Sequence, residues 1–345
     1  MTNRSFGAGL PQQIRVSAGT AVVLGIQEAK IDALPTTAYL MTYTHGKCTA
    51  NCAFCAQAKK SESKTDMLSR VSWPVYSTMS VLDGIEGAVK DGRVKRVCIQ
   101  ALNYPEVFTD LEAIVRTVCS RSKVSISVSC QPPTCKNIRQ LADAGAERIA
   151  IPLDAATEEI FERTKGSCAE GPYRWEKQFD LLNEAVKAFG KGKVSTHLIV
   201  GLGETEREMV ETVQKCVDMS VLPAMFAFTP VLGTALQAKA QPPLRNYRRI
   251  QVARHLILHG IARYENMTFC FDGRLVDFGV EKERLMLMIQ TGVPFLTSGC
   301  PNCNRPYYNE KPTGPIYNYP RELTRTELLE IQKQVFEDLG RKTYV

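Results

Sequence analysis

The densest group of reactive side chains is a short cysteine-rich segment, His45-Gly-Lys-Cys48-Thr-Ala-Asn-Cys52-Ala-Phe-Cys55, which places three thiols within eight residues. Thiolates are soft ligands that suit iron and zinc, and one loop can wrap three of them around an iron–sulfur cluster. A four-iron cluster held by three cysteines keeps one iron open for a substrate or cofactor. Cys48, Cys52 and Cys55 are therefore the first candidate metal ligands and the candidate catalytic centre.

Two other interpretations apply to these cysteines. A zinc site usually takes a fourth protein ligand, often from a second CxxC pair. Buried structural cysteines are the other alternative, but they would not explain three thiols in one polar loop. This loop follows a predicted strand, and active sites of α/β barrels lie at the carboxyl ends of their strands.

A second pair, Cys300 and Cys303, forms a CxxC motif after the last predicted strand. Such a pair indicates either a metal site or a redox dithiol. A cluster would need further ligands, and candidates on predicted strands are Cys98, Cys130 and Cys270. We hypothesise an auxiliary iron–sulfur cluster, expected to be of the 4Fe–4S type, held by Cys300, Cys303 and two of these three. A serine such as Ser298, or Arg274, stays open as the last ligand.

Composition excludes several classes of protein. Among 345 residues, 44% are hydrophobic and 23% are charged, which excludes a disordered chain, a collagen and a coiled coil. The net charge of +7 falls short of the concentrated basicity of a nucleic-acid binder, so no nucleic acid is expected, although an acidic partner or anionic cofactor would fit. No apolar stretch reaches the length of a membrane helix or signal peptide, which predicts a cytoplasmic protein with reduced cysteines and no membrane association.

The order of predicted elements must position these cysteines. Eight β-like runs follow one another with helical segments between most of them: 38–44, 96–101, 124–129, 148–153, 194–201, 222–229, 267–271 and 294–298. Several are continuous apolar runs, as expected for parallel strands buried on both faces. The alternation predicts an α/β fold, a (β/α)8 TIM-type barrel over residues 37–299. An N-terminal extension (1–36) precedes it, and a cysteine-containing tail (300–345) follows.

Helix signals support this division. Apolar residues recur at helical spacing within 110–119, and a second helix is expected over about 175–189. In the tail, Thr324 and Glu327 form a capping box before Leu328, Leu329 and Ile331, which predicts a terminal helix.

The CxxxCxxC spacing, with an aromatic residue before the last cysteine, resembles the signature of radical S-adenosylmethionine (SAM) enzymes. The resemblance implies a 4Fe–4S cluster on Cys48, Cys52 and Cys55, whose open iron binds the amino and carboxylate groups of SAM. One electron, from a ferredoxin or another donor, then cleaves SAM to a radical that abstracts hydrogen from an unactivated carbon.

The same resemblance assigns residues that would bind the cofactor. Phe54 resembles the aromatic residue that contacts adenine, and Asp154, at the end of the fourth predicted strand, would accept hydrogen bonds from the ribose. The stretch from His197 through Gly201, Gly203 and Glu204 is similar to the family's adenine-binding strand, with His197 in place of its first glycine. An Asp at a strand end is otherwise most often a helix N-cap.

Within this family the chain most resembles biotin synthase. There, three strand cysteines and an arginine hold a sacrificial cluster that donates sulfur. Cys98 and Cys130 stand at the first two cysteine positions, but Ser195 stands at the third. The seventh strand lacks the arginine, and Arg274 follows its turn. The biotin synthase cluster is therefore not simply present.

The tail from Cys300 to Tyr308 resembles that of the biotin-synthase-like subunit of bipartite lipoyl synthases of archaea. This implies sulfur insertion into an octanoyl chain on a lysine of a lipoyl domain or glycine-cleavage H protein, with a second radical SAM subunit as partner. Lipoyl carriers are typically acidic, which suits a +7 chain.

Three alternatives remain. The nearest is biotin synthase or another biotin-synthase-like enzyme, such as a mutase, acting on a free small molecule. A non-catalytic electron-transfer or scaffold subunit would keep the cluster motif without cleaving SAM. An RNA-modifying enzyme is disfavoured because no basic RNA-binding segment is appended. The sequence leaves open which carbon receives sulfur, whether the partner subunit is obligatory, and the oligomeric state.

Overall fold

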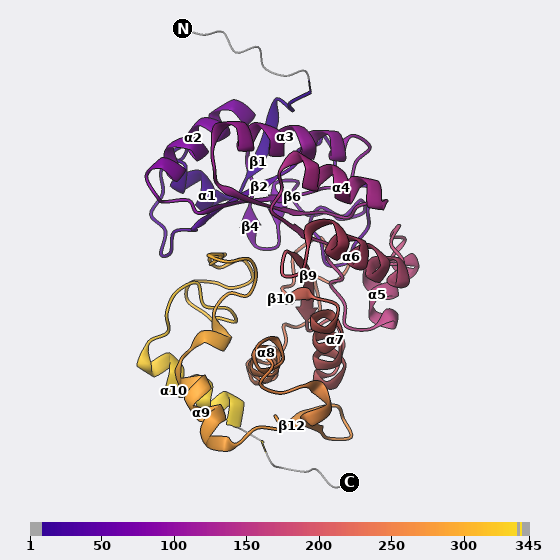
Figure 1. Cartoon of the computed structure of the whole chain (residues 1–345), viewed down its shortest axis with the longest axis vertical. Helices are drawn as coiled ribbons and strands as arrows, with labels where there is room; N and C mark the ends of the chain where they lie inside the picture. The colour runs from indigo at the N-terminus through magenta and orange to yellow at the C-terminus, as the bar shows by residue number, and fades with distance from the viewer. Residues whose placement is uncertain (1–8, 337–338, 340–345) are drawn as a thin grey trace.

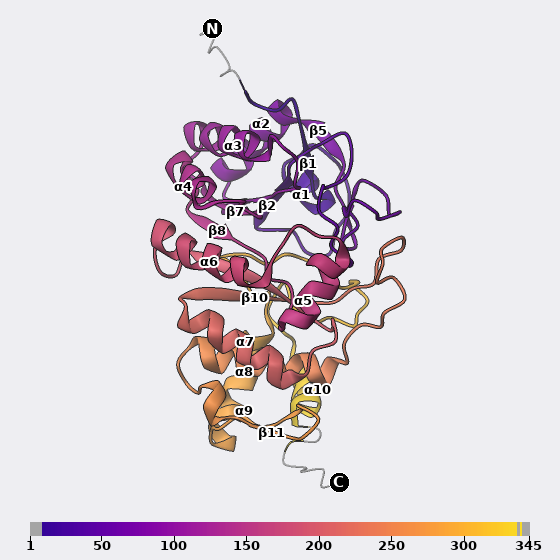
Figure 2. The ribbon, with the colours of Figure 1, turned by 90° about the vertical axis from the view of Figure 1, so that its right-hand side faces the viewer.

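The computed structural model describes residues 9–336 and 339. The first eight residues of the predicted N-terminal extension, and residues 337–338 and 340–345 of the predicted tail, lie outside the described residues. Figures 1 and 2 show the described chain in two views at right angles.

Six strands form a parallel sheet: β2 (Thr37–Met41), β6 (Arg96–Gln100), β7 (Ser125–Ser129), β8 (Arg148–Ala150), β9 (Val194–Val200) and β10 (Val221–Ala227). Each pairs in parallel with its neighbour in this order. They coincide, within a few residues at each end, with the first six predicted strands. The TIM-type α/β fold is confirmed.

Helices connect and cover these strands: α2 (Thr78–Lys90), α3 (Val107–Arg121), α4 (Cys135–Ala144), α5 (Glu158–Thr164), α6 (Trp175–Phe189), α7 (Glu206–Asp218) and α8 (Leu244–Leu258). Their apolar stripes face the sheet, as in α3, where Leu111, Ile114, Val115 and Val118 are buried. In Figure 1, α2, α3 and α4 lie on the outer side of the sheet, and the loops of the orange-to-yellow C-terminal segment lie on its inner side.

The seventh and eighth predicted barrel strands are wrong. The seventh segment contains β11 (Thr268–Phe269), which pairs antiparallel with β12 (Leu275–Asp277) in a separate hairpin. An Asp-Gly turn lies between the two strands, and such turns favour a hairpin over a crossover. The eighth segment begins as a 3-10 turn, Val293–Phe295, because Pro294 lacks the N–H that a central strand needs. α9 (Lys282–Gln290) lies between these two segments.

The N-terminal extension adds to the sheet. β1 (Gln13–Val16) pairs antiparallel with β2 on one side and with β5 (Val75–Ser77) on the other. α1 (Ala18–Val23) follows β1, and its cap residue Ser17 accepts a hydrogen bond from the Thr20 amide. A short hairpin, β3 (Met67–Leu68) with β4 (Val71–Ser72), precedes β5.

Residues 298–305, which we call the strap, join the first and last parallel strands. At the β10 end, the Met225 amide donates to the Ser298 hydroxyl at 2.7 Å. At the β2 end, the Thr36 amide donates to the Asn304 side chain at 3.0 Å, and the Arg305 amide donates to the Tyr39 hydroxyl at 3.0 Å. The strap therefore closes the side of the sheet that the two missing strands would have filled.

The rest of the tail packs on α8. The predicted terminal helix is α10 (Arg325–Phe336), and the Thr324–Glu327 capping box is present: the Glu327 amide donates to the Thr324 hydroxyl at 3.3 Å, and the Thr324 amide donates to the Glu327 carboxylate at 2.7 Å. Among the described helices, none has the length and apolar character required to cross a bilayer.

Candidate active site

The first cysteine loop follows β2 and is fixed by buried polar side chains. The Lys47 ammonium donates to the carbonyls of Ala56 and Ser63, at 2.9 and 2.7 Å. The Gln57 amide, fully buried, donates to the carbonyls of Thr65 and Met67, at 2.8 and 2.6 Å. The loop is therefore held in shape by its own chain.

Cys48, Cys52 and Cys55 line one cavity, as predicted for ligands of a single centre, and we call it the outer cavity. Burial raises the pKa of all three thiols, that of Cys55 to about 12, and repulsion from neighbouring thiolates adds to the shift of Cys52 and Cys55. The loop alone therefore favours neutral thiols. A cationic iron–sulfur cluster would reverse this preference, because metal binding deprotonates a thiol.

The donor set fits a cluster of several irons. Among residues 9–336 and 339, no three Cys, His, Asp or Glu side chains converge closely enough to hold a single metal ion. A cluster takes each thiolate on a different iron, so its ligands stand further apart than those of one zinc ion.

Phe54 lies between this outer cavity and a second, inner cavity, and lines both. It packs against an apolar cluster that includes Phe161, Leu202 and Phe228. Its ring is therefore a fixed wall beside the three thiols, which suits the predicted contact with a flat base.

Asp154 also lines both cavities and has a backbone conformation that is uncommon for a residue other than glycine. Its backbone is in the left-handed region, with φ 67°, and bridges to β9: its amide donates to the His197 carbonyl, and its own carbonyl accepts from Ile199, both at 2.8 Å. Its carboxylate pairs with the Lys165 ammonium at 2.7 Å. The conformation turns the carboxylate toward the cavities instead of a helix N-terminus.

Lys165 was missed by sequence reasoning. Its side chain is buried, and its ammonium also donates to the Pro152 carbonyl at 2.7 Å and lies 4.9 Å from the centre of the Tyr173 ring. Both residues line the outer cavity. A single lysine between polar residues carries no motif, so only the fold brings it to Asp154.

The Gly201–Glu204 turn, next to the site, is fixed by hydrogen bonds to one carboxylate. The Glu204 carboxylate accepts hydrogen bonds from the amides of Gly201, Leu202 and Gly203, at 2.6, 3.0 and 3.0 Å. A Cβ on Gly201 would lie 2.8 Å from the Pro242 ring, so the turn requires glycine there. Among the described residues that line the two cavities, Gly201, Gly203 and Glu204 do not appear. Leu202 of this turn belongs to the apolar cluster against which Phe54 packs.

His197 separates the two cavities. Its ring lies 4.8 Å from that of Phe226, and burial lowers the pKa of His197 to about 4, against an opposing effect from Asp154. The imidazole is therefore neutral at neutral pH and can accept or donate one hydrogen bond.

This burial predicts a pH-dependent stability. Between about 6.5 and about 4, the unfolded chain takes up a proton at His197 that the folded chain excludes, so the free energy of unfolding is expected to fall as the pH is lowered through this window. Chemical denaturation of wild type and His197→Gln across the window measures the effect. His255 has a similarly lowered pKa, but it is present in both proteins, so its contribution cancels when their pH profiles are compared. Parallel pH profiles would contradict the assignment.

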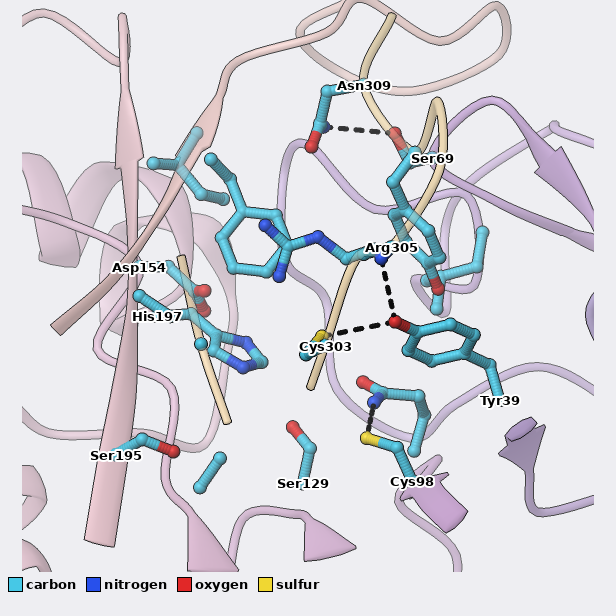
Figure 3. A pocket seen from close by; sticks show the side chains of 18 of the residues that line it. Tyr39, Ser69, Cys98, Ser129, Asp154, Ser195, His197, Cys303, Arg305 and Asn309 are labelled. Atoms are coloured by element: carbon cyan, nitrogen blue, oxygen red, sulfur yellow. Dashed lines mark hydrogen bonds between the residues drawn. The ribbon is translucent and has the colours of Figure 1, made fainter. Parts of the chain in front are cut away.

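The inner cavity brings together a second group of thiols, Cys98, Cys300 and Cys303. The Gln100 amide donates to the Cys98 sulfur at 3.1 Å, the Tyr39 hydroxyl lies 3.1 Å from the Cys303 sulfur, and the Ser127 hydroxyl lies 3.3 Å from the Cys300 sulfur. Burial raises the pKa of Cys98 and Cys303, and neighbouring thiolates raise both further. Figure 3 shows Cys303 near the centre of the view, joined to the Tyr39 hydroxyl, with Cys98 below it.

Of the three candidate partners for Cys300 and Cys303, the structure brings only Cys98 to them. Cys130 shares the face of Ile126 and Val128, which pack in the main apolar core, and it lines the outer cavity. Cys270 lies in the β11–β12 turn with Arg274, whose main-chain carbonyl accepts from the Cys270 amide at 2.8 Å.

Ser127 and Arg305 line the inner cavity, in place of Ser298 and Arg274, which the sequence left open as the last ligand. The strand register pairs Cys98 with Ser127, and the Arg96 guanidinium donates to the Ser127 hydroxyl at 2.9 Å. The Arg305 guanidinium lies 3.8 Å from the centre of the Phe226 ring, and both residues line the inner cavity. Ser298 binds β10, as described for the strap, so its hydroxyl is already engaged.

The two cavities share a wall made by Phe54, Cys55, Leu68, Gln100, Ser129, Asp154 and His197. The site therefore contains two groups of three thiols, one on each side of this shared wall. A family model described as the radical SAM superfamily matches residues 42–216, half of the chain. The chain belongs to the radical SAM superfamily.

Curated relatives of this radical SAM enzyme are biotin synthases. That of Magnetococcus marinus is 27% identical over 203 residues, which covers 57% of this chain and 58% of the relative. That of Persephonella marina is 25% identical over 211 residues, covering 59% and 57%. The match thus spans less than two thirds of either relative. The enzyme is biotin-synthase-like, and this relationship implies a 4Fe–4S cluster and SAM as its cofactors.

Solved structures agree on the fold. The FeFe-hydrogenase maturase of Carboxydothermus hydrogenoformans superposes with a TM-score of 0.50 at 16% identity, covering 64% of this chain and 51% of that one. A methylornithine synthase gives a TM-score of 0.50 at 13% identity, covering 70% and 65%.

Proposed function

We propose that this radical SAM enzyme inserts sulfur into an unactivated alkyl chain. The observation that carries the proposal is the group formed by Cys98, Cys300 and Cys303, which faces the outer site across the shared wall. Three thiols on the cavity wall suit an auxiliary iron–sulfur cluster, and a cluster beside the site of radical formation is a source of sulfide. A carbon-skeleton mutase does not need this second group.

The residues of the outer site would hold SAM and the first cluster. Cys48, Cys52 and Cys55 supply the thiolates, Phe54 supplies a flat wall for the base, and Asp154 supplies a carboxylate for hydroxyl groups. When bound, the reduced cluster and SAM supply a carbon-centred radical that removes one hydrogen atom from the substrate. The aromatic and aliphatic residues of the inner cavity, such as Phe226 and Phe228, would keep water away from that carbon.

The residues of the inner site would hold the sulfur source. Cys98, Cys300 and Cys303 would give three ligands, and the Ser127 hydroxyl, 3.3 Å from the Cys300 sulfur, is a candidate for the fourth. Gln100 and Tyr39 donate toward the sulfurs and orient them. When bound, the cluster would supply the sulfide for a carbon–sulfur bond in place of the broken carbon–hydrogen bond.

The substrate that best fits is an octanoyl chain on a lysine of a carrier protein, as in a lipoyl synthase. Phe226, Phe228 and Ile199 line the inner cavity and suit an unbranched alkyl chain. The net charge of +7 suits an acidic carrier, either a lipoyl domain or an H protein. A second radical SAM subunit and a ferredoxin, or another electron donor, complete the proposed assembly.

Biotin synthase activity is the second candidate, and the curated relatives favour it. The sulfur-insertion chemistry is the same, and the substrate would be free dethiobiotin. Ser195 weighs against this reading, because it stands on the inner wall where the resemblance leads one to expect a third strand cysteine.

Anaerobic turnover tests the proposal. The reconstituted, reduced enzyme is given SAM and a carrier peptide whose octanoyl chain is deuterated, or dethiobiotin in a parallel sample. We expect deuterium in 5′-deoxyadenosine, a thiolated octanoyl product by mass spectrometry, and loss of iron from the protein. Deuterium transfer without a thiolated product from either substrate would contradict sulfur insertion; thiolation of dethiobiotin alone would replace the lipoyl assignment.

A further inference from the structure

The inner cavity has a polar end that the proposed chemistry does not use. Asn309 lines the cavity and is only 7% exposed, yet its side-chain carbonyl oxygen, Oδ1, accepts no hydrogen bond. Figure 3 shows Asn309 at the opposite end of the cavity from Cys98, with Arg305 and Cys303 between them. A buried acceptor without a donor is unfavourable, so this atom calls for a partner that arrives with the substrate.

The neighbouring hydroxyls fix which half of the Asn309 amide faces the cavity. Its Nδ2 lies 3.4 Å from the hydroxyl of Ser69 and 3.4 Å from that of Thr229. The Thr229 hydroxyl gives its own hydrogen to a main-chain carbonyl, that of Asn309 at 3.1 Å or Ala227 at 3.3 Å, so it accepts from Nδ2. The carbonyl oxygen is therefore the half left for a ligand.

The Asn309 backbone is also held rigidly, which pre-organises the side chain. The Asn309 amide donates to the Glu310 carboxylate at 3.0 Å, and that carboxylate accepts from the Asn318 amide at 2.9 Å. Glu310 and Asn318 are both buried. A fixed acceptor selects ligands by the position of their donor, because little side-chain entropy is lost on binding.

The cavity between Asn309 and the thiols is lined by apolar residues such as Leu68, Phe226 and Phe228, with the Arg305 guanidinium lying over the Phe226 ring. A ligand that fills it beside Asn309 therefore pairs an apolar chain with a hydrogen-bond donor that meets Oδ1. A free fatty acid would bring carboxylate oxygens against Oδ1, and an ester or thioester would bring no donor. A secondary amide brings one N–H at the junction of chain and carrier.

We propose that Asn309 is a specificity-determining residue that accepts the N–H of a substrate amide, so that the enzyme acts on an acyl chain joined to its carrier through nitrogen. The inference rests on the proposed function for the identity of the acyl chain. It adds a separate requirement, which concerns the bond between that chain and its carrier. The amide N–H, held at Asn309, then fixes how far along the cavity each carbon of the chain extends. Asn309 thereby positions the chain relative to the thiols.

The test is a binding measurement without turnover. The reconstituted enzyme, with SAM but no reductant, is titrated anaerobically with a peptide carrying N-octanoyl-lysine and with the matched peptide in which oxygen replaces the amide N–H. We expect wild type to bind the amide about tenfold more tightly, since the ester leaves the buried acceptor unpaired. Asn309→Leu should remove this preference, and Asn309→Asp, which keeps an acceptor oxygen, should retain it.

A control variant, Asn137→Leu on the outer helix α4, should keep the wild-type preference. Equal binding of amide and ester by wild type would overturn the inference, whatever the variants do, and does not depend on their folding. A thiolated product in the turnover experiment, together with equal binding here, would leave the proposed function standing and this inference refuted. Binding of dethiobiotin, but of neither peptide, would refute both the octanoyl assignment and amide recognition.

Discussion

A Cys55→Ala variant is expected to lose about four irons per chain and to cleave SAM only at the background rate. The Cys55 thiol is buried in the outer cavity, where Cys48 and Cys52 also lie. With two thiolates, the loop cannot retain a four-iron cluster against chelation. Iron analysis, the visible absorption of the reconstituted protein and release of 5′-deoxyadenosine measure the result.

The matched control is Cys119→Ala. Cys119 is an exposed cysteine on α3 and lines neither cavity, so its variant should keep wild-type iron and cleavage. Full iron content and SAM cleavage in Cys55→Ala would rule out the outer site as the site of the first cluster.

A Cys303→Ala variant is expected to lose about four irons as well, but with a different functional result. Carbon–sulfur bond formation should stop, while SAM cleavage to 5′-deoxyadenosine continues, because the outer loop is untouched. The Cys303 thiol contacts the Tyr39 hydroxyl at 3.1 Å and faces Cys98 and Cys300. The measurement is iron content together with product analysis by mass spectrometry.

Cys270→Ala provides the comparison. The sequence admits Cys270 as a ligand, but the structure places it in the β11–β12 hairpin, so this variant should keep both iron content and thiolated product. If Cys303→Ala formed thiolated product at the wild-type yield, the inner thiols could not be the sulfur site. Loss of product in Cys270→Ala, with no change in Cys303→Ala, would mean that the hairpin cysteine holds the sulfur source and the inner thiols do not.

The parallel strands and the first cysteine loop could be predicted because their signals are local. Several of the six strands are apolar runs, and Cys48, Cys52 and Cys55 lie within one loop. The prediction of the last two barrel strands was wrong, also for local reasons. β11 and β12 are separated only by a short turn, so they pair with each other. The eighth segment begins with a 3-10 turn that contains Pro294.

The inner site could be predicted only in part because it depends on distant contacts. Strand alternation places Ser127 on the same face as Ser129, and both line the inner cavity, whereas Cys130 follows the strand and lines the outer cavity. Lys165 and Asn309 carry no motif, and their roles arise from burial against residues far away in sequence. Such residues become visible only when the unsatisfied or paired atoms of the folded chain are known.

The strap also has a consequence for how the protein matures in the cell. A ribosome completes all six parallel strands before residues 298–305 are made, and domains tend to fold as they emerge. The outer loop can accept its cluster on a partly synthesised chain, whereas Cys300 and Cys303 reach Cys98 only after the strap has spanned β10 and β2. Under the proposed function, iron–sulfur loading of this protein would therefore be ordered in time, with the inner centre installed last, after the strap has closed the sheet.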